Sequence, residues 1–196
     1  MDQGHIRATN IACRRGERVL FARLSLALGA GEALHVTGPN GVGKSSLIRV
    51  LAGLLPAFAG EVELHGGAGL VDERPALDPH LPLARALAFW QRMDGPAPEA
   101  AAAAVARLGL ADLGDVPVRF LSTGQKKRAA MARLIAQGAP VWLLDEPLNG
   151  LDSAAVTLIE GLVAEHCAAG GLAVVASHQP IALPGAMRLA IADFAA

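Results

Sequence analysis

Several residue types are scarce in this sequence, and their scarcity excludes some classes of protein. The 196 residues contain no tyrosine, 4% aromatic residues, and two cysteines, Cys13 and Cys167. Two cysteines cannot form the disulfide framework of a small secreted domain, so we expect both to be free thiols in a reducing cytosol. The sequence also lacks the Cys-x-x-Cys-His segment that attaches haem, so no haem ligand set is visible.

Neither a strong net charge nor a long apolar run is present. The net charge of −1 at pH 7 gives no electrostatic reason to expect a nucleic-acid partner. Although 53% of the residues are hydrophobic, no stretch reaches the roughly 18 uninterrupted apolar residues of a membrane span. The N-terminus lacks the apolar core of a signal peptide. We therefore expect a chain that neither spans a membrane nor is secreted.

A glycine-rich loop is the most informative segment that is present. Residues 38–45 read Gly-Pro-Asn-Gly-Val-Gly-Lys-Ser, between an apolar strand at 32–37 and an apolar-periodic helix at 46–53. Such a loop points successive backbone N–H groups at a polyphosphate, while its lysine reaches the β- and γ-phosphates and its serine a Mg²⁺ ion. We expect ATP to be held by Gly38, Pro39, Asn40, Gly41, Val42, Gly43, Lys44, Ser45 and Ser46.

Four more segments follow in an informative order. Leu-Ser-Thr-Gly-Gln at 121–125 opens a helix that runs to residue 137, with Ser122 as its N-cap. Val-Trp-Leu-Leu-Asp-Glu at 141–146 is typical of a buried parallel strand that carries carboxylates to the edge of a sheet. Asn-Gly-Leu-Asp at 149–152 follows as a turn, and a strand at 172–177 carries His178 to the same edge.

The joint order of these motifs resembles the ABC ATPase family over nearly the whole chain. The matching segments are Walker A at 38–45, the signature at 121–125, Walker B at 141–146, the D-loop at 149–152 and the H-loop at His178. The resemblance implies an α/β P-loop NTPase fold, a RecA-like core with an antiparallel β edge, plus a small helical subdomain. It implies a single ABC ATPase domain over 1–196, with the core at 1–74 and 139–196 and the helical subdomain at 75–138.

The resemblance also implies roles for the site residues. Asp145 and Ser45 would hold Mg²⁺, Glu146 would act as the general base, and His178 would contact the γ-phosphate of ATP. In this family the signature meets nucleotide held by a second subunit, and one chain here carries one Walker A and one signature. We therefore expect a homodimer, with signature contacts from Ser122, Gly124 and Gln125.

Smaller features resemble the ATP-binding subunits of cytochrome c maturation (haem exporter) transporters. They are Asp-Val-Pro-Val-Arg at 115–119, Gly-Gly at 170–171, Ser-His-Gln-Pro at 177–180, and the short chain. This resemblance implies integral membrane permease partners of the CcmB and CcmC type, at the cytoplasmic face of the bacterial inner membrane. Three alternatives stay open: the ATPase of another ABC exporter, a degenerate nucleotide-binding regulatory subunit, and a soluble ABC ATPase acting on DNA or ribosomes.

The sequence departs from the family pattern before and after the loop. No glutamine occurs in residues 70–75, where Arg74 takes the position expected for the Q-loop, and we expect its side chain to face a phosphate or solvent. The aromatic residue that usually stacks on adenine is missing, and Arg14 or Arg15 could replace it. After the signature, residues 126–128 are predicted to form a solvated helix face, with a phosphate contact as the alternative.

The remaining pattern predicts further elements. Alternating residues indicate antiparallel strands at 5–12 and 18–28, and a short strand at 61–64. Helices are expected at 83–93, 98–108 and 154–169, and a last strand near 186–192.

Overall fold

The computed structural model describes residues 4–95, 98–183 and 185–195. Its strands are β1 (His5–Arg15), β2 (Arg18–Leu28), β3 (Ala33–Thr37), β4 (Ala59–His65), β5 (Ala68–Val71), β6 (Val141–Asp145), β7 (Leu172–Ala176) and β8 (Met187–Ala190). Its α-helices are α1 (Lys44–Leu51), α2 (Leu83–Asp94), α3 (Pro98–Arg107), α4 (Thr123–Gln137) and α5 (Ser153–Ala168). Short 3₁₀ turns cover Ala111–Leu113, Val118–Phe120 and Ile191–Phe194.

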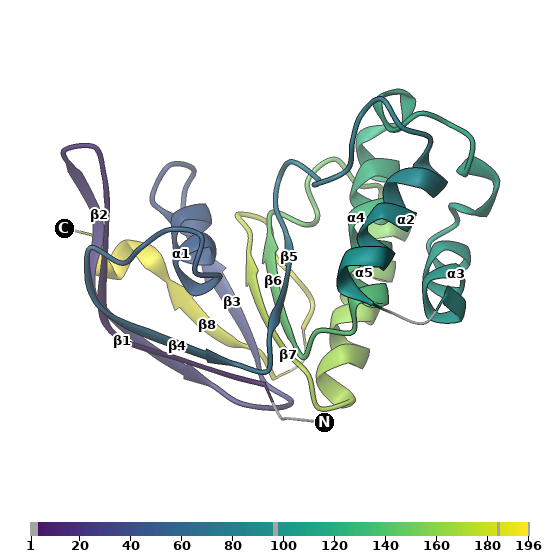
Figure 1. The fold of residues 1–196 in the computed structure, drawn as a ribbon. Helices are drawn as coiled ribbons and strands as arrows, with labels where there is room; N and C mark the ends of the chain where they lie inside the picture. Colours follow the sequence, from purple (N-terminus) through teal and green to yellow (C-terminus); the bar gives the residue numbers. More distant parts are fainter. Residues whose placement is uncertain (1–3, 96–97, 184, 196) are drawn as a thin grey trace.

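The strands form two sheets of different kinds (Figure 1). A parallel sheet has the order β5-β6-β7-β3-β8, and an antiparallel sheet has the order β2-β1-β4. Every residue of β6 and β7 is buried, which explains their continuous apolar sequences, because helices or the other sheet cover both faces of a parallel sheet. The antiparallel pairing expected for the two N-terminal strands is confirmed.

The space between the two sheets is filled by α1 and a hydrophobic core (Figure 1). β1 pairs with β2 and β4 in a register that places Ile6 opposite Leu28 and Leu64. Leu47 and Leu51 of α1 are buried in the same cluster as Ile6. This core fixes the position of α1, and therefore of the loop that precedes it.

On the other face of the parallel sheet, a second core joins α4 and α5 to β6 and β7. α2 and α3 pack onto α4, away from the sheet (Figure 1). β5 lies close to α4, and a Cβ atom added at Gly69 would lie 2.2 Å from Leu134 Cδ1. Within the described ranges, no helix combines the length and apolarity needed to cross a bilayer.

The fold confirms the predicted α/β class and adds one strand. β5 was not predicted, because Ala-Gly-Leu-Val is too short to show a period and begins directly after Gly66 and Gly67. The last strand ends at Ala190, and a 3₁₀ turn takes the place of its predicted continuation. The division into a core at 1–74 and 139–196 and a helical subdomain at 75–138 stays a prediction. Within the predicted domain of 1–196, residues 1–3, 96–97, 184 and 196 lie outside the described ranges.

Candidate functional site

The predicted phosphate-binding loop joins the end of β3 to the start of α1, where parallel strands of an α/β fold present their ligands. Gly38 and Gly43 have φ angles of 147° and 119°, a region that L side chains rarely adopt. A Cβ atom on Gly38 would lie 2.9 Å from the Val42 side chain. Glycine is therefore required at these positions for the loop to keep its path.

The ammonium group of Lys44 is held by backbone oxygens of the loop. Its Nζ donates to the carbonyls of Gly38 (2.9 Å) and Pro39 (3.3 Å). The same Nζ lies 3.3 Å from Glu146 Oε1. Lys44 is 5% exposed, so its charge sits at the floor of the loop, at the first positions of α1, where the helix dipole also favours an anion.

A cavity of about 710 Å³, counting its open mouth, lies against the loop. Seven residues predicted for the site line it together: Asn40, Gly41, Gly43, Lys44, Ser45, Ser46 and Glu146. Three further residues line it that were not predicted as site residues: Leu20, Glu73 and Asn149. The phosphate-binding loop, Lys44 and the carboxylates of Glu73 and Glu146 therefore line one cavity, although they come from distant parts of the chain.

Asp145 ends β6 beside this cavity and is 2% exposed. Its Oδ1 has no hydrogen-bond partner in the described part of the chain. Burial raises the pKa of Asp145, with the neighbouring Asp72 and Glu146 acting in the same direction, while Ser45 and Arg49 act against it. A carboxyl group with one unpartnered oxygen close to a serine hydroxyl fits a hard divalent cation.

The described ranges contain no group of three or more His, Cys, Asp or Glu that could hold a metal on its own. The Ser45 hydroxyl and the Asp145 carboxyl are a donor set that fits Mg²⁺, because Mg²⁺ commonly uses one or two protein oxygens with phosphates and water.

Glu146 is held at both its backbone and its carboxylate. It has φ 48°, a left-handed conformation that costs a non-glycine residue about 1–2 kcal/mol. Its N–H donates to Ala176 O at 2.8 Å, which ties it to β7. Its Oε2 lies 2.9 Å from His178 Nδ1, and its Oε1 faces Lys44. The structure thus brings Glu146 and His178 into direct contact.

The signature residues lie outside the lining of this cavity in the described structure. Ser122 caps α4: its Oγ accepts from Gln125 N–H at 3.2 Å, and Gln125 Oε1 accepts from Ser122 N–H at 2.8 Å. This reciprocal capping box satisfies two N–H groups at the helix start. A Cβ atom on Gly124 would lie 3.5 Å from the Leu151 side chain. The helix start is therefore well formed, but its signature residues do not line the cavity beside the chain's own phosphate-binding loop.

The two departures from the family pattern have different outcomes: Arg74 faces solvent, which is one of its two expected orientations, whereas neither arginine expected near adenine reaches the cavity. Arg74 is exposed and Glu73, its neighbour, lines the cavity instead. Arg14 lies over the Phe58 ring, 4.4 Å from its centroid, and neither it nor Arg15 lines the cavity. The apolar side chain on the cavity wall is that of Leu20.

The prediction that residues 126–128 form a solvated helix face is wrong, because Lys127 is 5% exposed. Its Nζ donates to the backbone carbonyl of Glu146. Its place two residues after the signature gave no sign of burial, because charged residues early in a helix usually face solvent.

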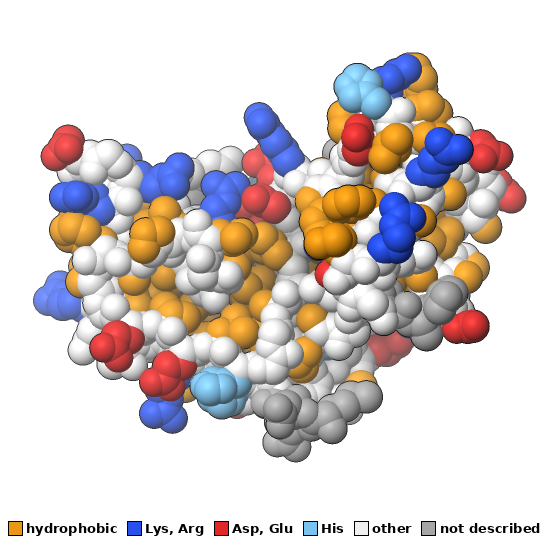
Figure 2. Space-filling model, in the orientation of Figure 1, with side chains coloured by type: hydrophobic (Ala, Val, Ile, Leu, Met, Phe, Trp, Pro, Cys, Tyr) orange, Lys and Arg blue, Asp and Glu red, His pale blue; other side chains and the backbone are white. Residues whose placement is uncertain are grey.

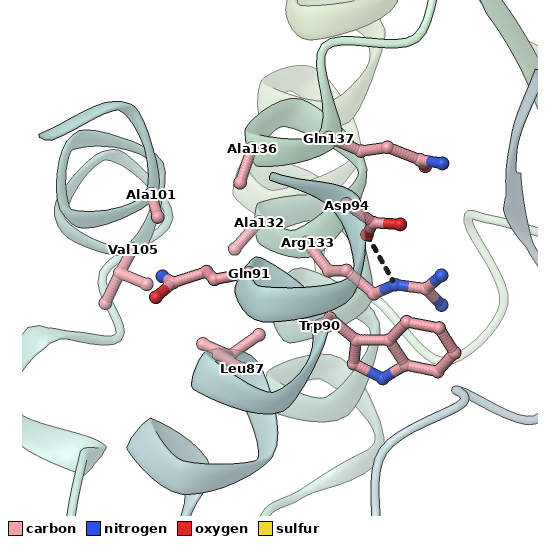
Figure 3. Close-up of a pocket in the computed structure, with 10 residues that line it drawn as sticks. All are labelled: Leu87, Trp90, Gln91, Asp94, Ala101, Val105, Ala132, Arg133, Ala136 and Gln137. Atoms are coloured by element: carbon pink, nitrogen blue, oxygen red, sulfur yellow. Dashed lines mark ion pairs between the residues drawn. The ribbon is translucent and has the colours of Figure 1, made fainter. Parts of the chain in front are cut away.

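A second pocket lies between α2, α3 and α4 (Figure 3). Arg133 crosses it, with its guanidinium 3.4 Å from the Trp90 ring centroid and its Nε 3.9 Å from Asp94 Oδ2. None of the predicted site residues lines this pocket. We read it as the packed interior of the helical part.

A glycine-rich loop on a helix start, a buried lysine, and paired carboxylates at the end of a parallel strand define a P-loop nucleoside triphosphatase. A family model described as ABC transporter matches residues 21–149, so the chain belongs to the ABC transporter family.

Within that family the chain is similar to proteins named CcmA. The cytochrome c biogenesis ATP-binding export protein CcmA of Novosphingobium aromaticivorans is 59% identical over 188 residues, which cover 95% of each chain. CcmA of Sphingopyxis alaskensis is 54% identical, covering 89% of this chain and 90% of the relative. The family resemblance argued from the motifs is confirmed, and the chain is an ATP-hydrolysing subunit of the ABC transporter type.

Solved structures agree on the fold. A nucleotide-free ATP-binding cassette from an ABC transporter has a TM-score of 0.75 at 24% identity, covering 90% of this chain and 82% of that chain. An ATP-binding subunit of an ABC transporter has a TM-score of 0.80 at 19% identity, covering 88% of this chain and 79% of that chain.

Proposed function

We propose that the chain hydrolyses ATP to drive a membrane complex that handles haem during cytochrome c maturation. The supporting observation is its similarity, over 95% of both chains, to a protein named for export in cytochrome c biogenesis. We propose integral membrane partners of the CcmB and CcmC type, with the chain bound at the cytoplasmic face of the bacterial inner membrane.

In this proposal the loop residues and Lys44 grip the phosphates of ATP. The open cavity beside them and the positive end of α1 support this assignment. Ser45 and Asp145 would hold Mg²⁺, and the unpartnered Oδ1 of Asp145 supports that role. When bound, Mg²⁺ supplies charge neutralisation at the phosphate oxygens.

Glu146 is the proposed general base, and His178 orients it. A base must lie within hydrogen-bond reach of the water it activates, and Glu146 lines the cavity next to the loop. Its contact with His178 at 2.9 Å fixes the direction of the carboxylate. Glu146→Gln keeps the shape and removes the basic oxygen, so the rate of phosphate release should fall to near background.

Two copies are needed in this proposal, because Ser122, Gly124 and Gln125 do not line their own chain's cavity. A two-fold homodimer places each signature helix over the nucleotide of the other copy. With Mg-ATP, the Glu146→Gln variant should elute as a dimer in size-exclusion chromatography. A monomeric elution under those conditions would contradict the shared site.

Mixing two inactive variants tests the sharing more directly. Lys44→Ala removes phosphate binding and Ser122→Arg blocks the signature, so each homodimer should be inactive. A mixed dimer contains one site with both defects and one intact site, so mixing should restore part of the activity. No recovery, with dimers shown to exchange subunits, would contradict the arrangement.

A surface on the helical part supports the membrane partners. Phe89 and Met93 of α2 are 47% and 68% exposed, and Figure 2 shows hydrophobic side chains gathered over this part, among Lys and Arg side chains. Serine at both positions should reduce co-purification with the membrane subunits and leave the ATPase rate of the free chain unchanged. Unchanged co-purification would remove this surface from the proposal.

The cellular role is tested by complementation. In a host lacking its own subunit, the wild-type chain should restore covalently haem-bound c-type cytochromes, measured by haem staining, and Glu146→Gln should not. Restoration of another export process, but not of c-type cytochromes, would favour the alternative of a different exporter. The degenerate regulatory alternative is favoured instead if wild-type and Glu146→Gln chains release phosphate equally slowly.

A further inference from the structure

Lys127 is a buried charge that the site roles above do not use. It lies on the second turn of α4, is 5% exposed, and its Nζ donates to the backbone carbonyl of Glu146. Burial lowers the pKa of Lys127, while Glu146, Glu73 and Asp145 oppose that shift. Removing a lysine ammonium from water is unfavourable unless the charge is paired or hydrogen-bonded. The burial of Lys127 therefore depends on the groups that surround its ammonium.

The residue that Lys127 contacts is held in an unusual conformation. Glu146 has φ 48° and precedes a proline, which disfavours the right-handed helical region for it. Its carbonyl also lies 3.4 Å from the N–H of Asn149, and its own N–H is bonded to Ala176. The peptide group that follows Glu146 is therefore oriented by Lys127 of α4. The peptide group that precedes Glu146 is oriented by the hydrogen bond to Ala176 of β7.

Two other contacts place the start of α4 against the same loop. A Cβ atom on Gly150 would lie 3.1 Å from the Thr123 side chain, and one on Gly124 would lie 3.5 Å from the Leu151 side chain. The start of α4 thus lies next to the segment that follows β6, and of these three neighbouring pairs the one formed by Lys127 is the hydrogen bond to Glu146.

We propose that Lys127 is a positioning residue for ATP hydrolysis: it orients the Glu146 backbone, and so its carboxylate, from the signature helix of the same subunit. This inference rests on the proposed role of Glu146 as the general base. Lys127 does not line the nucleotide cavity, so it should act on the rate of the chemical step and not on nucleotide binding.

The test compares Lys127→Met with Lys127→Gln. Methionine keeps the apolar stem and removes the donor, whereas glutamine restores an N–H donor without the charge. We expect Lys127→Met to lower kcat about tenfold to a hundredfold while KM for ATP stays within about threefold, because a small misplacement of a catalytic group is enough for such a loss. Lys127→Gln should recover a large part of the lost rate.

The matched control is Lys126→Met, because Lys126 Nζ donates to Arg119 O at 3.2 Å instead of to Glu146. Its kcat should stay within about twofold of wild type. Thermal unfolding and Mg-ATP-dependent dimerisation, each measured for every variant, separate positioning from misfolding: Lys127→Met should stay folded and should still dimerise.

Three results would overturn the proposal: an unchanged kcat in Lys127→Met, an equal loss in Lys127→Gln, or a loss of ATP-dependent dimerisation together with activity. Glu146→Gln in the same assay distinguishes a failure of the proposed role of Glu146 from a failure of the proposed role of Lys127. If it remains active, the role of Glu146 fails; if it is inactive while Lys127→Met is fully active, only the role of Lys127 fails.

Discussion

Asp145→Asn should stabilise the folded chain and abolish ATP hydrolysis in the same protein. Asp145 is 2% exposed, and its Oδ1 has no partner among the described residues. Burial raises the pKa of this carboxyl above its ordinary value of 3.8. The buried environment of Asp145 therefore favours the neutral carboxyl over the charged carboxylate. Asparagine has almost the same shape as aspartate and carries no charge.

The magnitude follows from the cost of an unsatisfied buried group, about 1–3 kcal/mol. Asparagine still buries a polar group, so we expect a gain of about 1–2 kcal/mol in the free energy of unfolding. For a chain of this size that is a rise in Tm of about 2–8 °C. The gain should disappear at low pH, where Asp145 is protonated in both the folded and the unfolded chain.

The assay is thermal unfolding followed by circular dichroism, in EDTA and without nucleotide, together with phosphate release in Mg-ATP. Asp193→Asn, the same change at an exposed position, is the control and should leave Tm unchanged. A lower Tm in Asp145→Asn would refute the reasoning, because it would mean that the carboxylate has a stabilising partner. Normal hydrolysis in this variant would refute the metal role.

Four further changes test other parts of the structure. Ser122→Ala should lower the free energy of unfolding in urea by about 1 kcal/mol, because the cap of α4 is lost, while Ser122→Asn should lose much less. Gly69→Ala should cost about 1–3 kcal/mol, since its Cβ atom would overlap Leu134. Gly161→Ala on α5, where the described structure leaves open space, should instead stabilise by up to about 1 kcal/mol; destabilisation there would contradict the packing. Burial lowers the pKa of His35 from 6.5, so its protonation opposes folding: Tm should fall as the pH drops below about 6.5, and less so in His35→Asn.

Features that depend on neighbours along the chain could be predicted from the sequence. The loop at residues 38–45 needs glycines at set positions and a lysine and serine at its end, and these are contiguous. The cap formed by Ser122 joins residues three positions apart. The first four residues of β6 and all of β7 are apolar runs, so their burial could be predicted without knowing what covers them.

Which distant residues meet at the site depends on how the helices and sheets pack together. Glu73 reaches the cavity because β5 pairs with β6, and Leu20 because β2 belongs to a second sheet placed over α1. Lys127 is buried because α4 packs against the end of β6, where its ammonium finds the Glu146 carbonyl. Neither the strand order nor the packing of a helix on a sheet leaves a periodic mark in the sequence, since each depends on which surfaces come together when the chain folds.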